Sequence, residues 1–202
     1  MPVISNLKQE AEMKVLAINS SPRKNGNTAK VLGWVEEEFR SRGHEVEHIH
    51  ISDYKLEGCV GCYKCQMDPE ELVCSRQDAG VEIFGRMKEA DAIVYASPLY
   101  CWGFTAQVKP LIDRHLCLAT GYGDPSTHKS HIESKRVALL VTAAGQEGKG
   151  NSDLITEVFK RLADYVKTDV VAQLVVPFCT QPGDLGDEHK DKACAFVGEI
   201  LG

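Results

Sequence analysis

Short apolar runs alternate with longer amphipathic stretches along most of this chain. Four runs are almost continuously hydrophobic and rich in β-branched side chains: residues 15–18, 92–96, 137–141 and 170–176. Strands buried on both faces of a parallel sheet have this composition. A weaker run, residues 46–51, alternates apolar residues with histidines and is typical of an edge strand. The pattern therefore predicts five strands.

Between the strands, apolar residues recur at helical spacing. In residues 28–42, for example, Val31, Val35 and Phe39 fall on one face. Similar patterns predict four more helices: 81–88, 106–118, 154–166 and 193–201. Pro110 either kinks the second of these or starts its main body.

Strands that alternate with helices predict an α/β fold, a doubly wound five-stranded parallel sheet with helices on both faces. Periodicity leaves the strand order open. If the order is 2-1-3-4-5, the crevice for a ligand lies beyond the carboxyl ends of the first and third strands.

Composition narrows the class of protein. The 202 residues, 43% hydrophobic and 26% charged, contain no repeat or linker, so we expect a single domain over 1–202 with an extension at 1–12. A net charge of −6 argues against nucleic acid and anionic membranes as partners. The chain has no membrane-length apolar run and no signal-like start, which predicts a cytoplasmic protein. Cytoplasmic thiols stay reduced, so the eight cysteines indicate redox or metal chemistry rather than disulfides.

The segment that follows the first strand predicts a phosphate site. Residues 19–28 offer the hydroxyls of Ser20, Ser21 and Thr28 and the guanidinium of Arg23 where a helix begins. Free backbone N–H groups and the positive dipole end of a helix suit an anion. A capping role for Asn27 or Thr28 is the alternative and is compatible with it. Neither a Walker A loop nor a GxGxxG fingerprint is present.

Two later loops suit a flat ring. Residues 97–104 follow the third strand and contain Tyr100 and Trp102, which either border a heterocycle or serve packing or an interface. The loop at 142–151 offers small residues and close backbone approach. A phosphate site together with a planar-ring site is what FMN requires.

The chain resembles the NAD(P)H-dependent FMN reductases of the flavodoxin-like superfamily, and among them the iron–sulfur flavoproteins. The resemblance spans about residues 13–176 and is carried by SSPRKNGNT, GCVGCYKC, SPLY and Lys109 with IDR, in that order. It implies a flavodoxin-like fold. It also implies that the FMN phosphate and ribityl end lie on Ser20, Arg23, Asn25, Asn27 and Thr28. The isoalloxazine would be bordered by Pro98, Leu99, Tyr100, Cys101, Trp102, Gly103, Ala143 and Gly145.

The cysteine-rich loop at 58–74 has several interpretations. Cys59, Cys62, Cys65 and Cys74 could supply four thiolates to a [4Fe–4S] cluster that exchanges single electrons with FMN. Eight residues separate the last two, a longer gap than the compact motif has. The alternative is a bare thiol loop that only shapes the site; zinc and a redox dithiol are weaker alternatives. The other cysteines, Cys101, Cys117, Cys179 and Cys194, are expected to be small core residues.

These features predict an FMN-dependent oxidoreductase in which the flavin carries the chemistry, so no side chain is assigned as catalytic. The resemblance implies NAD(P)H or a ferredoxin-like protein as electron donor, a small molecule or protein as acceptor, and a homodimer or homotetramer. The alternatives are a cluster-free NAD(P)H:quinone or flavin reductase and a non-enzymatic flavodoxin-type carrier. The connection 119–135 is expected to be a lid or an interface, and Asp113 and Arg114 to anchor their helix by an ion pair.

Overall fold

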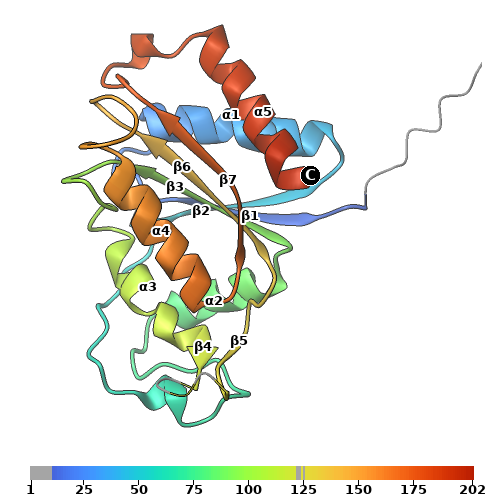
Figure 1. The fold of residues 1–202 in the computed structure, drawn as a ribbon, viewed down its shortest axis with the longest axis vertical. Helices are drawn as coiled ribbons and strands as arrows, with labels where there is room; N and C mark the ends of the chain where they lie inside the picture. The colour runs from blue at the N-terminus through green and yellow to red at the C-terminus, as the bar shows by residue number, and fades with distance from the viewer. Residues whose placement is uncertain (1–10, 122–123, 125) are drawn as a thin grey trace, which may run out of the picture.

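Five parallel strands form the central sheet of the computed structural model, which describes residues 11–121, 124 and 126–202 (Figure 1). The strands are β1 (Lys14–Asn19), β2 (Glu45–His50), β3 (Ala92–Pro98), β6 (Arg136–Thr142) and β7 (Asp169–Val176). They lie in the order β2-β1-β3-β6-β7, and every neighbouring pair is parallel. The chain moves from β1 to β2 on one side and returns to β3 on the other. The loops after β1 and β3 therefore diverge from adjacent strand ends, where ligands bind in such sheets.

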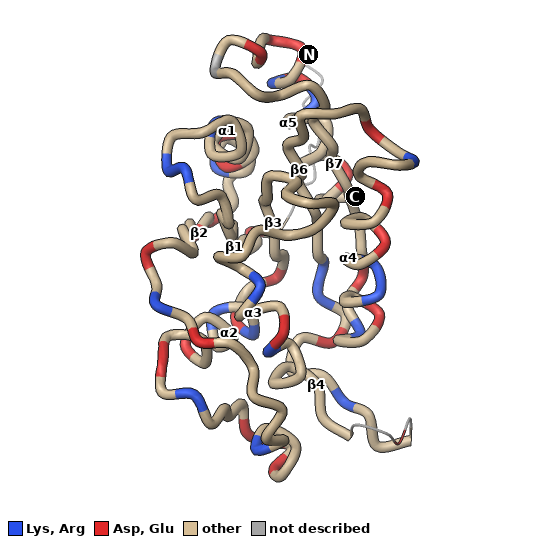
Figure 2. The backbone as a smooth tube through the Cα atoms, turned by 90° about the vertical axis from the view of Figure 1, so that its left-hand side faces the viewer, with Lys and Arg blue, Asp and Glu red and all other residues tan. Residues whose placement is uncertain are grey.

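Helices cover both faces of the sheet (Figure 1). On one face, α1 (Asn27–Ser41) and α5 (Asp187–Leu201) pack against inward residues such as Val15 and Ala17. On the other face, α2 (Gly80–Glu89), α3 (Lys109–Asp113) and α4 (Asp153–Tyr165) share a second apolar cluster with Leu16 and Ile18. Alternate residues of one strand thus serve two separate cores, because successive strand side chains point to opposite faces. Figure 2 shows acidic and basic residues interspersed along the backbone.

Two predicted elements differ in the structure. The run 170–176 was expected to be buried on both faces, but β7 is an edge strand, and Val170, Val171 and Leu174 are only half-buried. The helix expected at 106–118 is a short α3 with Pro110 in its first turn, followed by a 3₁₀ turn, His115–Cys117. Proline suits that first turn because it lacks an N–H, and an N–H at this position would have no partner within the helix.

Two long connections meet beside the α2–α4 face. Residues 51–79 carry the cysteine-rich loop, and 119–135 include a small antiparallel ribbon that the sequence did not predict, β4 (Ala119–Thr120) with β5 (Lys129–Ser130). The Gln66 amide joins the two connections, donating at 2.8 Å to the carbonyls of Leu116 and Ala119. Most of the extension expected at 1–12 lies outside the described residues. No described helix is long and apolar enough to cross a membrane.

Candidate functional site

A cleft opens at the carboxyl ends of β1, β3, β6 and β7, and we call it the carboxyl-edge cleft. Seven residues predicted to bind the cofactor line it: Ser21, Arg23, Asn27, Thr28, Pro98, Leu99 and Tyr100. They come from two loops far apart in sequence, which the pairing of β1 with β3 brings together. Gly26, Thr142, Ala144, Cys179 and Thr180 complete the lining. The first three belong to segments that the sequence analysis identified, whereas Cys179 and Thr180 were not identified. Cys179 and Thr180 follow β7 at the same sheet edge, and this position was their signal.

The N-terminus of α1 forms one end of this cleft. Its N-cap is Gly26, without any side-chain cap, so the capping role considered for Asn27 or Thr28 is wrong. The Asn27 amide instead donates to the Gln181 carbonyl at 3.0 Å, and the Thr28 and Thr142 hydroxyls are 2.7 Å apart. The first-turn N–H groups therefore lack a side-chain cap, which suits a bound anion.

Two other predicted phosphate ligands, Ser20 and Asn25, do not line the cleft. Ser20 is buried, and its hydroxyl donates to the Ala96 carbonyl at 2.9 Å, which ties the end of β1 to β3. Asn25 is exposed and does not line the cleft. The Ser21 hydroxyl accepts the backbone N–H of Arg23 at 3.1 Å, so it shapes the loop that carries the guanidinium.

A tight turn follows β3, and Tyr100 at its start lines the cleft, whereas the predicted residues Cys101, Trp102 and Gly103 do not line it. Tyr100 and Gly103 exchange backbone hydrogen bonds of 3.1 and 3.0 Å, and the two residues between them are left-handed, with φ of 48° at Cys101 and 62° at Trp102. Residues other than glycine rarely adopt this conformation. The Trp102 indole donates to the Gly150 carbonyl at 3.2 Å, yet 56% of its surface is exposed. Cys101 is exposed too, so the expectation of a core residue is wrong.

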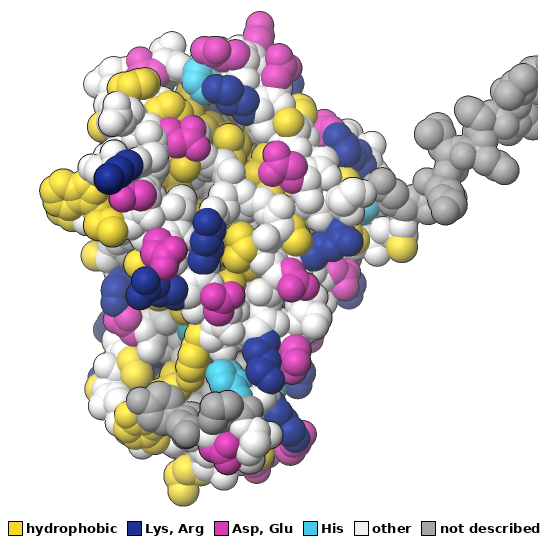
Figure 3. Space-filling model, in the orientation of Figure 1, with side chains coloured by type: hydrophobic (Ala, Val, Ile, Leu, Met, Phe, Trp, Pro, Cys, Tyr) yellow, Lys and Arg dark blue, Asp and Glu magenta, His cyan; other side chains and the backbone are white. Residues whose placement is uncertain are grey.

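Exposed hydrophobic residues gather at this end of the molecule. Figure 3 shows hydrophobic side chains projecting from the left edge, and the strands of Figure 1, in the same orientation, point toward that edge. Tyr100, Trp102 and Phe178 belong to the loops after β3 and β7, and all three are exposed. Flat apolar surface at the cleft is suited to a planar heterocycle.

The loops after β6 and β7 are tied to each other by backbone hydrogen bonds. Ala143 donates to the Val176 carbonyl at 2.9 Å and accepts the Cys179 N–H at 2.8 Å. Gly145 accepts the Phe178 N–H at 3.3 Å. Ala143 and Gly145, which were predicted to border the cofactor, thus tie the two loops together and do not line the cleft, whereas Ala144 between them does. Burial raises the pKa of the Cys179 thiol, so this cleft thiol remains protonated at neutral pH.

A second hollow, the cysteine pocket, gathers the four cysteines of the 58–74 loop: Cys59, Cys62, Cys65 and Cys74. The sequence did not predict that five residues outside this loop line the same pocket: Ser75, Arg76, Arg114, Leu116 and Cys117. Backbone N–H groups support two of the sulfurs, Gly61 donating to Cys59 at 3.4 Å and Arg76 to Cys74 at 3.5 Å.

The thiols of this pocket differ in acidity. Cys62 is exposed and lies 3.0 Å from the Ser75 hydroxyl, and this contact lowers the pKa of the Cys62 thiol. Burial raises the pKa of Cys117, as do the neighbouring sulfurs of Cys65 and Cys74. Within the ranges that the structure describes, no three Cys, His, Asp or Glu side chains are grouped to hold a single metal ion.

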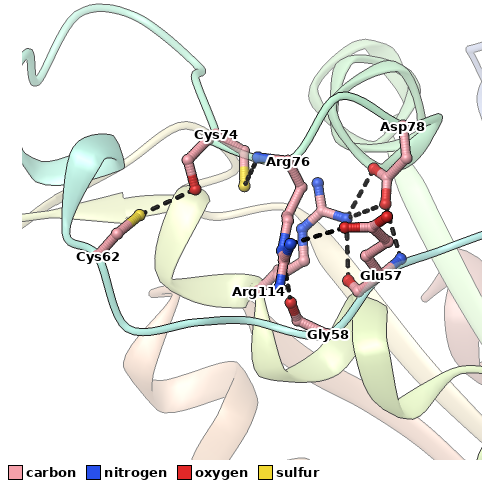
Figure 4. Close-up of polar contacts among 8 residues, drawn as sticks. Glu57, Gly58, Cys62, Cys74, Arg76, Asp78 and Arg114 are labelled. Atoms are coloured by element: carbon pink, nitrogen blue, oxygen red, sulfur yellow. Dashed lines mark hydrogen bonds and ion pairs between the residues drawn. The ribbon is translucent and has the colours of Figure 1, made fainter.

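A buried ion pair forms one wall of the cysteine pocket (Figure 4). Nη1 of Arg114 donates to both carboxylate oxygens of Asp78, at 2.7 and 2.8 Å, and lies 3.3 Å from the Glu57 carbonyl. The predicted anchoring of the helix therefore involves two pairs, because Asp113 binds Lys109 instead. Arg76 closes the loop by bonding the Glu57 carboxylate at 2.8 Å and the Gly58 carbonyl at 3.1 Å.

Known proteins place this architecture in a family. The family model for NADPH-dependent FMN reductases matches residues 13–173. An iron-sulfur flavoprotein of Archaeoglobus fulgidus is 34% identical over 194 residues, covering 93% of this chain and 79% of that protein.

Solved structures share the fold. An NAD(P)H:quinone oxidoreductase from Methanothermobacter marburgensis has a TM-score of 0.68 at 20% identity, covering 93% of this chain and 96% of that one. An azoreductase from Bacillus anthracis has a TM-score of 0.68 at 15% identity, covering 94% and 98%. The chain belongs to the NADPH-dependent FMN reductase family and is an FMN-dependent oxidoreductase.

Proposed function

We propose that this protein holds FMN in the carboxyl-edge cleft and a [4Fe–4S] cluster in the cysteine pocket, and that electrons pass between the two. The observation that carries the cluster is the convergence of Cys59, Cys62, Cys65 and Cys74 on one pocket. Four thiolates are the ligand set of such a cluster. Relatives named iron-sulfur flavoproteins support the same proposal.

The residues of the carboxyl-edge cleft fit the two ends of FMN. The uncapped start of α1, with the Thr28 hydroxyl and the Arg23 guanidinium, would hold the phosphate by charge-assisted hydrogen bonds. Pro98 and Tyr100 would lie against the isoalloxazine, and Trp102 would border it from the turn. Bound there, FMN supplies hydride and single-electron chemistry, and the protein orients the ring.

The N–H···S contacts in the cysteine pocket suit thiolate ligands. Gly61 and Arg76 direct backbone donors at the sulfurs of Cys59 and Cys74, and the lowered pKa of Cys62 favours its thiolate. Such outer contacts orient ligands and stabilise their charge. As β2 is parallel to β1, the cysteine-rich loop leaves the sheet at the same edge as the cleft.

The wider proposal is a single flavodoxin-like domain in a cytoplasmic homodimer or homotetramer. NAD(P)H or a ferredoxin-like protein would donate electrons, and a small molecule or a protein would accept them. The exposed aromatic residues Tyr100, Trp102 and Phe178 support a surface that meets another molecule at the cleft.

A cluster-free NAD(P)H:quinone or flavin reductase is the second candidate. The lack of a ready single-metal arrangement among the described residues favours it. In that case the cysteine-rich loop only shapes the surface beside the cleft. Membership of the reductase family argues against the non-enzymatic carrier.

Anaerobic purification followed by a visible spectrum and iron and sulfide analysis distinguishes the two candidates. The cluster predicts flavin bands, a broad absorption that bleaches on reduction, and about four iron atoms per chain. Flavin bands without iron would leave the cluster-free reductase. C62A should abolish iron binding while flavin stays bound; C194A, which changes a half-buried cysteine of α5 outside the pocket, is the matched control.

A further inference from the structure

Arg114 has donors that the protein does not use. The side chain is fully buried, with 0% of its surface exposed. Its hydrogen bonds to Asp78 and Glu57 are all donated by a single atom, Nη1. Nε and Nη2 form no hydrogen bond with any residue the structure describes. Unsatisfied donors of a buried cation are costly, and a native structure normally satisfies them.

Three neighbours surround part of the guanidinium. A Cβ added at Gly80 would lie 2.5–2.6 Å from Nη2, Cζ and Nη1, so the glycine backbone covers one face of the group. The Phe84 ring centroid is 6.0 Å from Cζ. Asp78 occupies the edge that carries Nη1.

Arg114 lines the cysteine pocket together with Cys74 and Cys117. This pocket is therefore the place where a ligand could accept hydrogen bonds from Nε and Nη2. Figure 4 shows the guanidinium between the Cys74 and Asp78 side chains. Burial by itself lowers the pKa of Arg114, but the Asp78 carboxylate and the Cys74 sulfur outweigh burial and raise it.

We propose that Nε and Nη2 of Arg114 donate hydrogen bonds to the sulfur atoms of an anionic group in the cysteine pocket, and that this contact raises the group's reduction potential. The inference rests on the cluster proposed above. Four thiolates and a [4Fe–4S] core carry net negative charge, and a buried anion needs a partner of opposite charge. Added electron density is stabilised by a nearby cation and by N–H···S bonds, so reduction becomes easier. Asp78 holds the guanidinium in place from behind.

The experiment measures the potentials of both cofactors by redox titration in R114Q, R114K and R76Q. We expect R114Q to lower the equilibrium constant for one-electron reduction of the cluster about tenfold, which lowers its reduction potential by about 59 mV. R114K retains the charge and should recover part of the shift. R76Q is the comparison within the same pocket: Arg76 also lines it, but its side chain is paired with Glu57 and Gly58 and is 32% exposed, so its shift should be smaller. The FMN potential should change less in every variant.

Loss of iron from R114Q with FMN retained, when R76Q keeps its iron, also supports the contact. A fully loaded R114Q with the wild-type cluster potential overturns it and leaves the cluster intact. A wild-type protein that takes up no iron overturns both the cluster and this inference, so the two failures are distinguishable.

Two measurements keep the inference testable if R114Q does not fold. The double variant R114Q/D78N removes the buried pair together, leaves no unpaired charge, and should show the same lowered potential. Pulsed EPR of R76Q, with ¹⁵N only in the guanidino group of its arginines, needs no change at Arg114 and leaves out both the Arg76 side chain and the Arg76 backbone N–H that donates to Cys74. A ¹⁵N coupling to the reduced cluster is the expected result, and its absence contradicts a contact with Arg114.

Discussion

The carboxyl-edge cleft and the cysteine pocket are built in different ways. The cleft is formed by short loops that leave adjacent strands, so the backbone pairing of β1, β3 and β6 places its residues. The pocket is formed by a long connection and a 3₁₀ turn, and side-chain bonds hold it: Arg114 to Asp78, and Gln66 to Leu116. The comparison teaches that the cleft should tolerate the substitution of single polar side chains, whereas the pocket depends on a few buried side-chain hydrogen bonds.

The largest expected effect comes from breaking the buried ion pair. D78A leaves the Arg114 charge buried without its partner, and we expect a loss of about 3–5 kcal/mol in the free energy of unfolding. D113A removes the same residue type from the exposed pair with Lys109 and should cost at most about 1 kcal/mol. Denaturant unfolding of both variants measures the contrast. Equal losses would mean that the pocket is not held by its buried pair.

Acid should weaken the pocket side of the molecule through His115. This ring is fully buried beside Tyr95, 2.9 Å from its hydroxyl, and burial lowers the pKa of His115 to about 4. In the unfolded chain the same group titrates near 6.5. The unfolded state therefore binds more protons between these values, and the free energy of unfolding should fall by roughly 3 kcal/mol as pH drops from about 6.5 to about 4.

Unfolding free energies at a series of pH values in that window test the assignment. H115Q removes the titrating group while keeping an amide for Tyr95, so its stability should change less with pH. If H115Q and the wild type have the same slope, other groups account for the acid sensitivity.

Removing one cation from the cleft should weaken FMN binding without unfolding the protein. R23A deletes the guanidinium at the proposed phosphate end, and a charge-assisted hydrogen bond is worth about 1.5–3 kcal/mol, or about tenfold or more in Kd. K24A removes a neighbouring charge that is paired with Asp53 and does not line the cleft. Fluorescence titration with FMN compares the two. Equal affinities would remove the phosphate site from this end of the cleft.

The smallest effect concerns backbone strain in the aromatic turn. C101G relieves a left-handed φ of 48°, and we expect the free energy of unfolding to rise by up to about 1 kcal/mol. C194G, in the interior of α5, should instead destabilise by about 1 kcal/mol. Thermal unfolding of the two variants shows whether each substitution raises or lowers the stability. A destabilised C101G would show that the cysteine side chain itself contributes to the turn.

Local patterning located most of the elements but not all of their bounds. The start of α5 at Asp187 was missed because its first turns are charged, with Lys190 and Lys192 among exposed positions. The edge position of β7 was missed because a hydrophobic run reports composition rather than the number of neighbouring strands. In the cleft, residues of the loops after β1 and β3 were identified, whereas Cys179 and Thr180 lay beyond any recognisable motif.

What the sequence by itself determined is local and compositional. Hydrophobic periodicity predicted the α/β alternation, glycine and hydroxyl residues marked the start of α1 as a candidate anion site, and CxxCxxC marked the sulfur-rich loop. Only the tertiary structure decided which distant side chains meet. Arg114 pairs with Asp78, 36 residues earlier, and Cys117 joins cysteines more than 40 residues before it. Such contacts depend on how long connections fold back on the sheet, and the spacing of residues along the chain carries no record of that.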